Sequence, residues 1–249
     1  MFGASVFSFV NVVVYRLPRK MNYCTGKSIC PACERALKGA QMIPIFSYLF
    51  LRGKCGYCKS AIPFRYVFME IIGGVLALFT FIWYVDFIHF EMSALFKFLL
   101  VFTFLSVLAA IAFIDADTME IPNRLVLFAA VLGLGAVFLF PQISLIDRGI
   151  GILSVSVPFL LLALAISGAF GGGDIKLMAA CGLFLGWKLN LVALFFALIT
   201  GGAYGVYLLA SKKKGRKDHF AFGPFLCAGV ALSLFFGQLA LNWYLGFFS

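Results

Sequence analysis

The chain has 249 residues, of which 63% are hydrophobic and only 12% are charged, and its mean hydropathy is +1.04. This composition excludes a soluble globular protein and indicates a protein that crosses a membrane several times. The net charge of +10 does not indicate nucleic-acid binding, because the basic residues are not interleaved with base-stacking aromatic residues along a soluble face.

Apolar runs of about 17 to 25 residues, long enough to cross a hydrocarbon core of about 30 Å, recur along the chain. We expect them to be helices, because the bilayer offers no water to unpaired backbone groups. The first run is expected to be a retained anchor, since no small-residue cleavage site follows it. The pattern predicts an all-α integral membrane protein with about eight transmembrane helices, at residues 1–17, 66–88, 93–114, 125–141, 149–169, 175–188, 189–210 and 222–247.

The distribution of basic residues predicts the orientation of these helices. If the first loop is cytoplasmic, only Lys97, Arg148 and Lys188 of the 20 Lys and Arg residues fall outside. The cytoplasmic set then includes the basic run 212–217, KKKGRK, near anionic headgroups. Because cytoplasmic loops are enriched in Lys and Arg, this bias predicts both termini outside and the large first loop inside.

Residues 18–65 form the one hydrophilic segment long enough to fold, and they contain CPAC (Cys30, Cys33) and CGYC (Cys55, Cys58). Two C-x-x-C knuckles about twenty residues apart predict a tetrahedral four-thiolate zinc site. A site whose four positions are all occupied by sulfur is structural, and its metal would stabilise a domain too small to build its own core. The alternative, two disulfides, is disfavoured by the predicted cytosolic location. Cys24, beside this cluster, is expected to be a free thiol, with a role as an alternative ligand left open. Cys181 and Cys227 are expected to be small apolar residues of helices.

Two aspartates stand at the ends of predicted spans. Asp115 lies in FIDADTMEIPN and Asp174 in GGGD, and the two intervening crossings return the chain to the same membrane edge. A carboxyl group there is costly and by default suggests a function. The alternative is a helix cap or an ion pair, Asp174 with Lys176 or Asp115 with Arg124. Two carboxyls held close cannot both ionise, so one keeps its proton and the pair can hold a water between base and acid, as in aspartyl proteases.

Ordered blocks along nearly the whole chain resemble the type IV prepilin leader peptidases, which are GxGD membrane aspartyl proteases of bacteria. The blocks include CPAC, IPIFSYLFLRGKC, CGYC, FIDADTMEIPNRL, GGGDIKLMAACGLFLGW and FGPFLCAG. The resemblance implies an enzyme of the bacterial inner membrane that cleaves the basic leader from prepilin or pseudopilin substrates on the cytoplasmic side. It places the catalytic pair on Asp115 and Asp174, whereas Asp117 lies at a position where the residue type varies within the family.

The same resemblance implies supporting roles for further residues. Lys176 would hold the aspartate loop or touch the substrate, and Asn123 would cap the helix after Pro122. Independently of the resemblance, Gly171 and Gly173 have no side chain and would allow the backbone to approach a partner helix or an extended peptide closely. Asn11 in the first span is expected to hydrogen-bond between helices.

Many family members with the cysteine loop also methylate the new N-terminal amine with S-adenosylmethionine. No glycine-rich dinucleotide-type fingerprint follows a predicted strand here, so the residues that would bind this cofactor are unassigned. The loop and Glu70 are the places to look, although Glu70 could instead pair with Arg65 or Lys59.

These features predict a first helix at 1–17, a cytoplasmic zinc-binding domain at 18–65 and a seven-helix protease core at 66–249. Two alternative functions are compatible with parts of this pattern. Another GxGD protease, such as a preflagellin peptidase, is disfavoured by the four-cysteine loop. A non-enzymatic metal-responsive transporter or assembly factor would carry carboxyls near the middle of several spans, whereas this chain carries them mainly at the edges.

Overall fold

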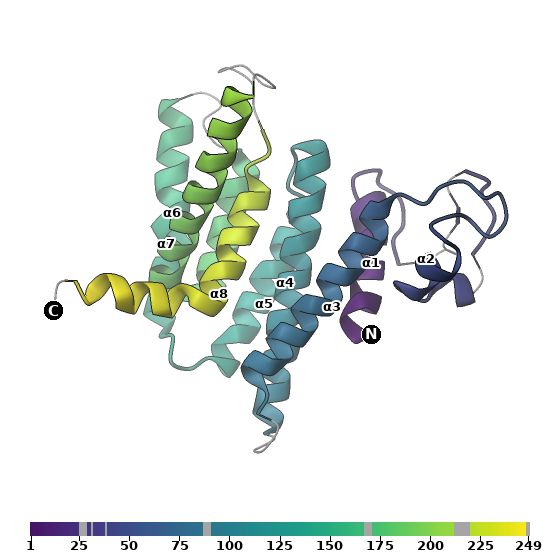
Figure 1. Cartoon of the computed structure of the whole chain (residues 1–249). Helices are drawn as coiled ribbons and strands as arrows, with labels where there is room; N and C mark the ends of the chain where they lie inside the picture. The colour runs from purple at the N-terminus through teal and green to yellow at the C-terminus, as the bar shows by residue number, and fades with distance from the viewer. Residues whose placement is uncertain are drawn as a thin grey trace. The chain divides into compact units, whose positions relative to one another are not determined.

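The computed structural model describes residues 1–24, 29–30, 32–37, 39–86, 91–166, 171–211 and 220–247. These residues form helices and turns, with two isolated β-bridges and no β-strand, which confirms the predicted all-α class (Figure 1). The basic run 212–217 lies outside the described residues, so the predicted orientation stays a prediction.

Five of the described helices are long and apolar enough to cross a membrane, and two apolar helices are shorter. The long helices are α3 (Phe64–Tyr84), α4 (Met92–Thr118), α6 (Leu145–Ala165), α7 (Gly172–Ala210) and α8 (Gly223–Leu245), and the shorter ones are α1 (Phe2–Arg16) and α5 (Asn123–Leu139). The chain is therefore a multi-pass membrane protein.

The chain divides into two compact units, Met1–Ser106 and Val107–Ser249, with the boundary inside α4. In the first unit α1 packs along α3 (Figure 1). Asn11 of α1 donates from Nδ2 to the carbonyl of Tyr66 at 3.1 Å, which confirms the predicted interhelical hydrogen bond. The connection between these helices contains a 3-10 helix, η1 (Gly39–Met42), and the short helix α2 (Phe46–Phe50). The predicted three-part division of the chain stays a prediction.

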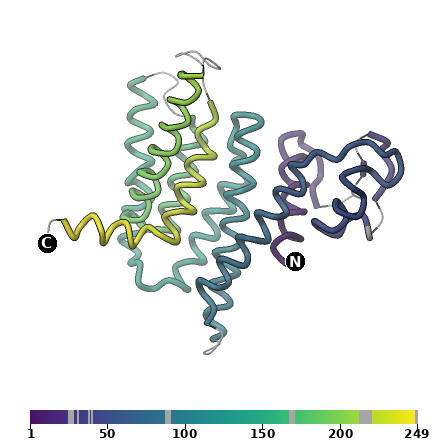
Figure 2. The backbone as a smooth tube through the Cα atoms, in the orientation of Figure 1, coloured from purple at the N-terminus to yellow at the C-terminus, as the bar shows by residue number. Residues whose placement is uncertain are grey.

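In the second unit α7 contacts α5, α6 and α8 (Figure 2). Its backbone breaks at Gly186, where φ is 74° and ψ is 172°. Asn190 Nδ2 lies 3.3 Å from the carbonyl of Met178, 12 residues earlier, although 12 residues of continuous helix would span about 18 Å. The chain therefore folds back at Gly186, and its two arms correspond to the predicted spans 175–188 and 189–210.

Glycine is required at this reversal for two reasons. The φ of 74° at Gly186 lies in the left-handed region, which is costly for residues with a side chain. A Cβ atom there would also lie 2.8 Å from Cγ2 of Ile143. The sequence places the boundary between the two arms at residue 188, and the structure moves the turn to this glycine.

Arg148 is buried inside α6, with 1% of its surface exposed. Its guanidinium donates to four backbone carbonyls at 2.8 to 3.0 Å, those of Ala136, Phe140, Leu183 and Phe184. These carbonyls lie at the ends of α5 and of the first arm of α7, where the helix dipole is negative. Those of Ala136 and Phe140 also accept from the backbone N–H groups of Phe140 and Ile143. The sequence predicts Arg148 as an outer-loop residue, and the structure corrects this because two helix ends converge on its side chain.

Candidate active site and metal centre

Asp174 lies in the first turn of α7, and 9% of its surface is exposed. Its Oδ2 accepts a hydrogen bond of 3.1 Å from the backbone N–H of Gly171, the residue before the helix. The carboxylate thus reaches back to a backbone donor that no intrahelical bond satisfies. The helix-cap alternative considered for Asp174 is therefore present, and it also holds the carboxyl group in one orientation.

Asp115 lies in the last turn of α4, and 5% of its surface is exposed. Its Oδ2 accepts a hydrogen bond of 2.9 Å from the backbone N–H of Gly223, the first residue of α8. Asp117, the neighbouring candidate, is exposed. Burial and the bond to Gly223 therefore distinguish Asp115 from Asp117.

The sequence alone does not assign a role to Gly223, although this glycine lies in the block FGPFLCAG. A Cβ atom on Gly223 would lie 2.6 Å from Oδ2 of Asp115. The available signal was a glycine followed by proline at a helix start, where backbone N–H groups are unpaired and can hold an anion.

The two carboxyl groups lie close enough to interact electrostatically. The turn before α5 also reaches the GGGD segment: a Cβ atom on Gly173 would lie 2.8 Å from Cβ of Ile121. Gly173 thus leaves no room for a side chain of its own beside Ile121, and the predicted approach to a partner helix or an extended peptide stays a prediction. The end of α4 and the starts of α7 and α8 together present two nearly buried carboxyls, an arrangement that can activate a water molecule.

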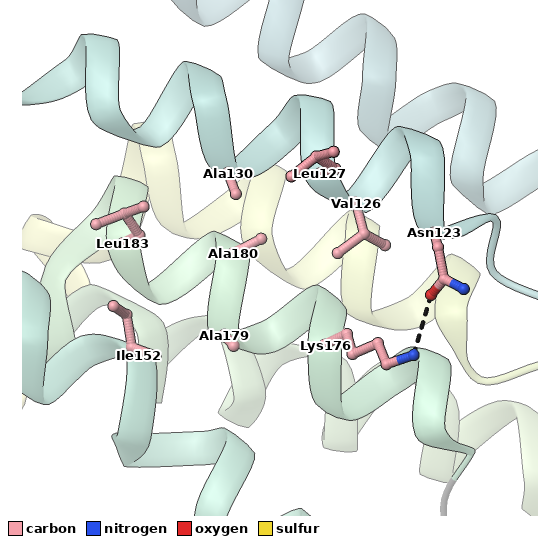
Figure 3. Close-up of a pocket in the computed structure, with 9 residues that line it drawn as sticks. All are labelled: Asn123, Val126, Leu127, Ala130, Ile152, Lys176, Ala179, Ala180 and Leu183. Atoms are coloured by element: carbon pink, nitrogen blue, oxygen red, sulfur yellow. Dashed lines mark hydrogen bonds between the residues drawn. The ribbon is translucent and has the colours of Figure 1, made fainter.

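Lys176 and Asn123 lie beside this site. Nζ of Lys176 donates to Oδ1 of Asn123 at 3.1 Å. The prediction that Asn123 caps α5 is wrong, because Pro122 occupies the capping position and Asn123 is the first helical residue, with its side chain directed to Lys176 (Figure 3).

A groove of about 370 Å³ extends from this pair between α5, α6 and α7 (Figure 3). The pair occupies one end, and the rest of the lining is apolar: Val126, Leu127, Ala130, Ile152, Ala179, Ala180 and Leu183. Such a groove suits a ligand with an apolar body.

Glu70 of α3 has a structural contact. Its Oε2 accepts a hydrogen bond of 2.8 Å from the backbone N–H of Ile45. Ile45 has a φ of 66°, a value that is rare for a β-branched residue. Glu70 therefore supports the strained turn that starts α2.

Four free thiols form a candidate metal centre. The Sγ atoms of Cys30, Cys33, Cys55 and Cys58 all lie within 4.8 Å of one another, and those of Cys30 and Cys58 are 3.9 Å apart. Four sulfur atoms at about 2.3 Å from a tetrahedral zinc ion would be about 3.8 Å apart. The thiols thus fit one metal ion.

The backbone around the two C-x-x-C segments has the same arrangement. Each is closed by an isolated antiparallel bridge, between Ile29 and Ala36 in one and between Lys54 and Ala61 in the other. Such tight turns direct two thiols from each knuckle toward one point.

Two of the thiols are biased toward the thiolate form that metals bind. Hydrogen bonding from the Ser60 side chain lowers the pKa of Cys58 to about 6. Backbone hydrogen bonds from Ala32 and Cys33 lower the pKa of Cys30. Outside this cluster, Cys24 is exposed and Cys181 and Cys227 are buried in helices, as expected.

Gly223→Ala is expected to lower the turnover of any reaction at this site by roughly 10- to 100-fold, because its methyl group would displace the Asp115 carboxylate. Steady-state kinetics of the purified protein measures the effect. Gly202→Ala is the matched control, since a Cβ atom on Gly202 meets nothing within 4 Å. Equal rates for the two variants would contradict a role for Gly223 in orienting Asp115.

The apolar helices and paired carboxyls define a multi-pass membrane protein with an aspartyl-protease type of site. Residues 1–84 match the bacterial Peptidase A24 N-terminal domain, and residues 102–206 match the Type IV leader peptidase family. A search of solved structures found no match to the chain.

Three relatives bear the name prepilin leader peptidase/N-methyltransferase, and each is 31% identical to the chain. The Legionella pneumophila protein aligns with 99% of this chain and 93% of its own length. The Bacillus subtilis protein aligns with 98% of this chain and 95% of its own length. The protein of Burkholderia pseudomallei strain K96243 aligns with 94% of this chain and 83% of its own length. The chain belongs to the prepilin leader peptidase/N-methyltransferase family.

Proposed function

We propose that this protein is a membrane aspartyl endopeptidase that removes the basic leader from prepilin or pseudopilin substrates and then methylates the new N-terminus. The observation that carries the peptidase assignment is the pair of nearly buried carboxyls, Asp115 and Asp174, each held by a backbone N–H at a helix start. The names of the relatives supply the substrate class and the second activity.

In the proposed mechanism Asp115 and Asp174 share one proton and hold a water molecule between them. The ionised carboxylate takes a proton from the water as the water oxygen attacks the scissile carbonyl carbon. The protonated carboxyl gives its proton to the leaving amide nitrogen, and the peptide C–N bond breaks. The N–H groups of Gly171 and Gly223 keep the carboxyls in place while the charges move.

The groove beside Lys176 is the proposed site for the apolar segment that follows the scissile bond. Its apolar lining matches that segment. The substrate helix would enter from the bilayer, while its basic leader would stay at the cytoplasmic face of the inner membrane.

The metal of the four-cysteine centre is proposed to be zinc, with a structural role, because four thiolates leave no open position for substrate. The purified protein is expected to contain about one zinc ion per chain, measured by mass spectrometry of the metal. Cys58→Ser should lose most of the metal, whereas Cys24→Ser should keep it. Folded protein without any metal would contradict the assignment.

For methylation, S-adenosylmethionine would supply the methyl group. Glu70, the acidic candidate of the first unit, already accepts a backbone hydrogen bond from Ile45, and the described residues provide no donor set that assigns the cofactor site. The methyltransferase proposal therefore rests on the family.

Mass spectrometry of a prepilin incubated with the protein in membranes tests both activities. Loss of the leader is expected with the protein alone. An added methyl on the new N-terminal amine is expected only when S-adenosylmethionine is present. An intact prepilin would contradict the peptidase, and a cleaved but unmethylated product would contradict the second activity.

A further inference from the structure

The connection between α1 and α3 exposes a patch of large apolar side chains. Between 44% and 83% of the surface of each of these residues is exposed: Met42, Ile43, Phe46, Leu49 and Phe50. The last three lie on α2 itself and share one face of it, where the rings of Phe46 and Phe50 stack with centroids 6.5 Å apart. A contiguous apolar patch of this kind is unusual on a surface that faces water, and it indicates a partner.

Two contacts fix this patch to the start of α3. Glu70 of α3 binds the backbone N–H of Ile45 just before α2, and the rings of Tyr48 and Phe64 meet edge to face with centroids 6.5 Å apart. Phe64 and Glu70 are separated by about 9 Å along the helix axis. The apolar side of α2 therefore lies level with the first two turns of α3.

The first turns of α3 carry their own exposed aromatic side chains. Phe64 and Phe68 are 63% and 45% exposed, and their rings lie 6.2 Å apart. Because α3 is long and apolar enough to cross the membrane, these rings mark its lipid-facing side near the point where it enters the bilayer. The patch on α2 continues this lipid-facing surface, which makes lipid the partner that best fits it.

The charge of the same segment favours anionic lipid. The sequence between Glu34 and Glu70 contains no carboxylate and six basic residues: Arg35, Lys38, Arg52, Lys54, Lys59 and Arg65. Of these, the four nearest to α2 and α3 in sequence, Arg52, Lys54, Lys59 and Arg65, are exposed. Basic side chains beside an apolar face are typical of segments that lie at the surface of anionic membranes.

We propose that α2 is an interfacial helix that lies on an anionic lipid surface. Phe46, Leu49 and Phe50 insert at the boundary between headgroups and acyl chains, and Arg52 and Lys54 contact lipid phosphates. Since Lys54 directly precedes Cys55, this contact keeps the second cysteine knuckle next to the membrane surface rather than free in solution. This role goes beyond peptide cleavage and does not depend on it.

Photo-crosslinking of the full-length protein in nanodiscs tests the proposal. The nanodiscs contain phosphatidylglycerol with a photoreactive group near the headgroup end of its acyl chain, and peptide mass spectrometry locates the adducts. Adducts are expected on α2. Phe50→Asp should lower their yield roughly tenfold, the factor expected when one large apolar side chain loses its burial. Ser47→Asp adds the same charge to the half-buried side of α2 and should retain the adducts.

Labelling of Phe68 in α3 shows that the lipid probe reaches the protein surface, and retained metal shows that each variant is folded. Adducts on α3 without adducts on α2 would overturn the proposal, as would crosslinks from α2 to a second copy of the chain. Equal labelling in neutral phosphatidylcholine would overturn the preference for anionic lipid. None of these readouts requires peptidase activity.

Discussion

Asp174→Asn and Asp115→Asn are each expected to reduce leader cleavage by roughly 10²- to 10⁴-fold, the range for loss of a general acid or base. An asparagine side chain can still accept the hydrogen bond from Gly171 or Gly223, so the helix cap and the fold should persist. The substitution therefore separates the chemical role of each carboxyl from its structural role. The measurement is the rate of leader loss by mass spectrometry in membranes.

Asp117→Asn is the matched control for this experiment. It changes the same functional group two residues from Asp115 but on an exposed side chain, so near-normal cleavage is expected. Full activity in Asp115→Asn together with loss in Asp117→Asn would move the catalytic role to Asp117. Full activity in Asp174→Asn would leave only the helix cap for that residue.

Arg148→Met is expected to destabilise the protein by about 3 kcal/mol or more, because it removes four hydrogen bonds from a charged donor, each of which contributes about 1.5–3 kcal/mol. The stability of Arg148→Lys should lie between those of Arg148→Met and the wild type, since one ammonium cannot reproduce the planar set of guanidinium donors. Thermal unfolding in detergent micelles measures the difference.

Lys188→Met provides the control for charge loss near the same helix reversal. Lys188 is exposed, and its ammonium lies 5.6 Å from the ring centre of Trp187. Its removal should change the stability by less than about 0.5 kcal/mol. Similar unfolding temperatures for Arg148→Met and Lys188→Met would contradict the bridging role of Arg148.

Features encoded in local patterns could be predicted from the sequence. Long apolar runs require helices because the bilayer cannot satisfy free backbone groups, and paired C-x-x-C motifs bring thiols together within tight turns. The positions of Asp115 and Asp174 at span ends also follow from hydropathy alone. These properties depend on neighbours in the chain, and they determine the fold class and the four-thiol cluster. The choice of Asp115 rather than Asp117 also required the family resemblance.

Contacts between distant segments were decided only by the tertiary structure. The partner of Asp115 is a backbone N–H 108 residues away, and Arg148 is buried because it meets the ends of two other helices. Asn123 turns to Lys176 rather than capping α5. Side-chain type alone does not specify which backbone group will face it, so the sequence determined the membrane helices, the cysteine knuckles and the candidate aspartates, whereas helix packing selected the partners that orient them.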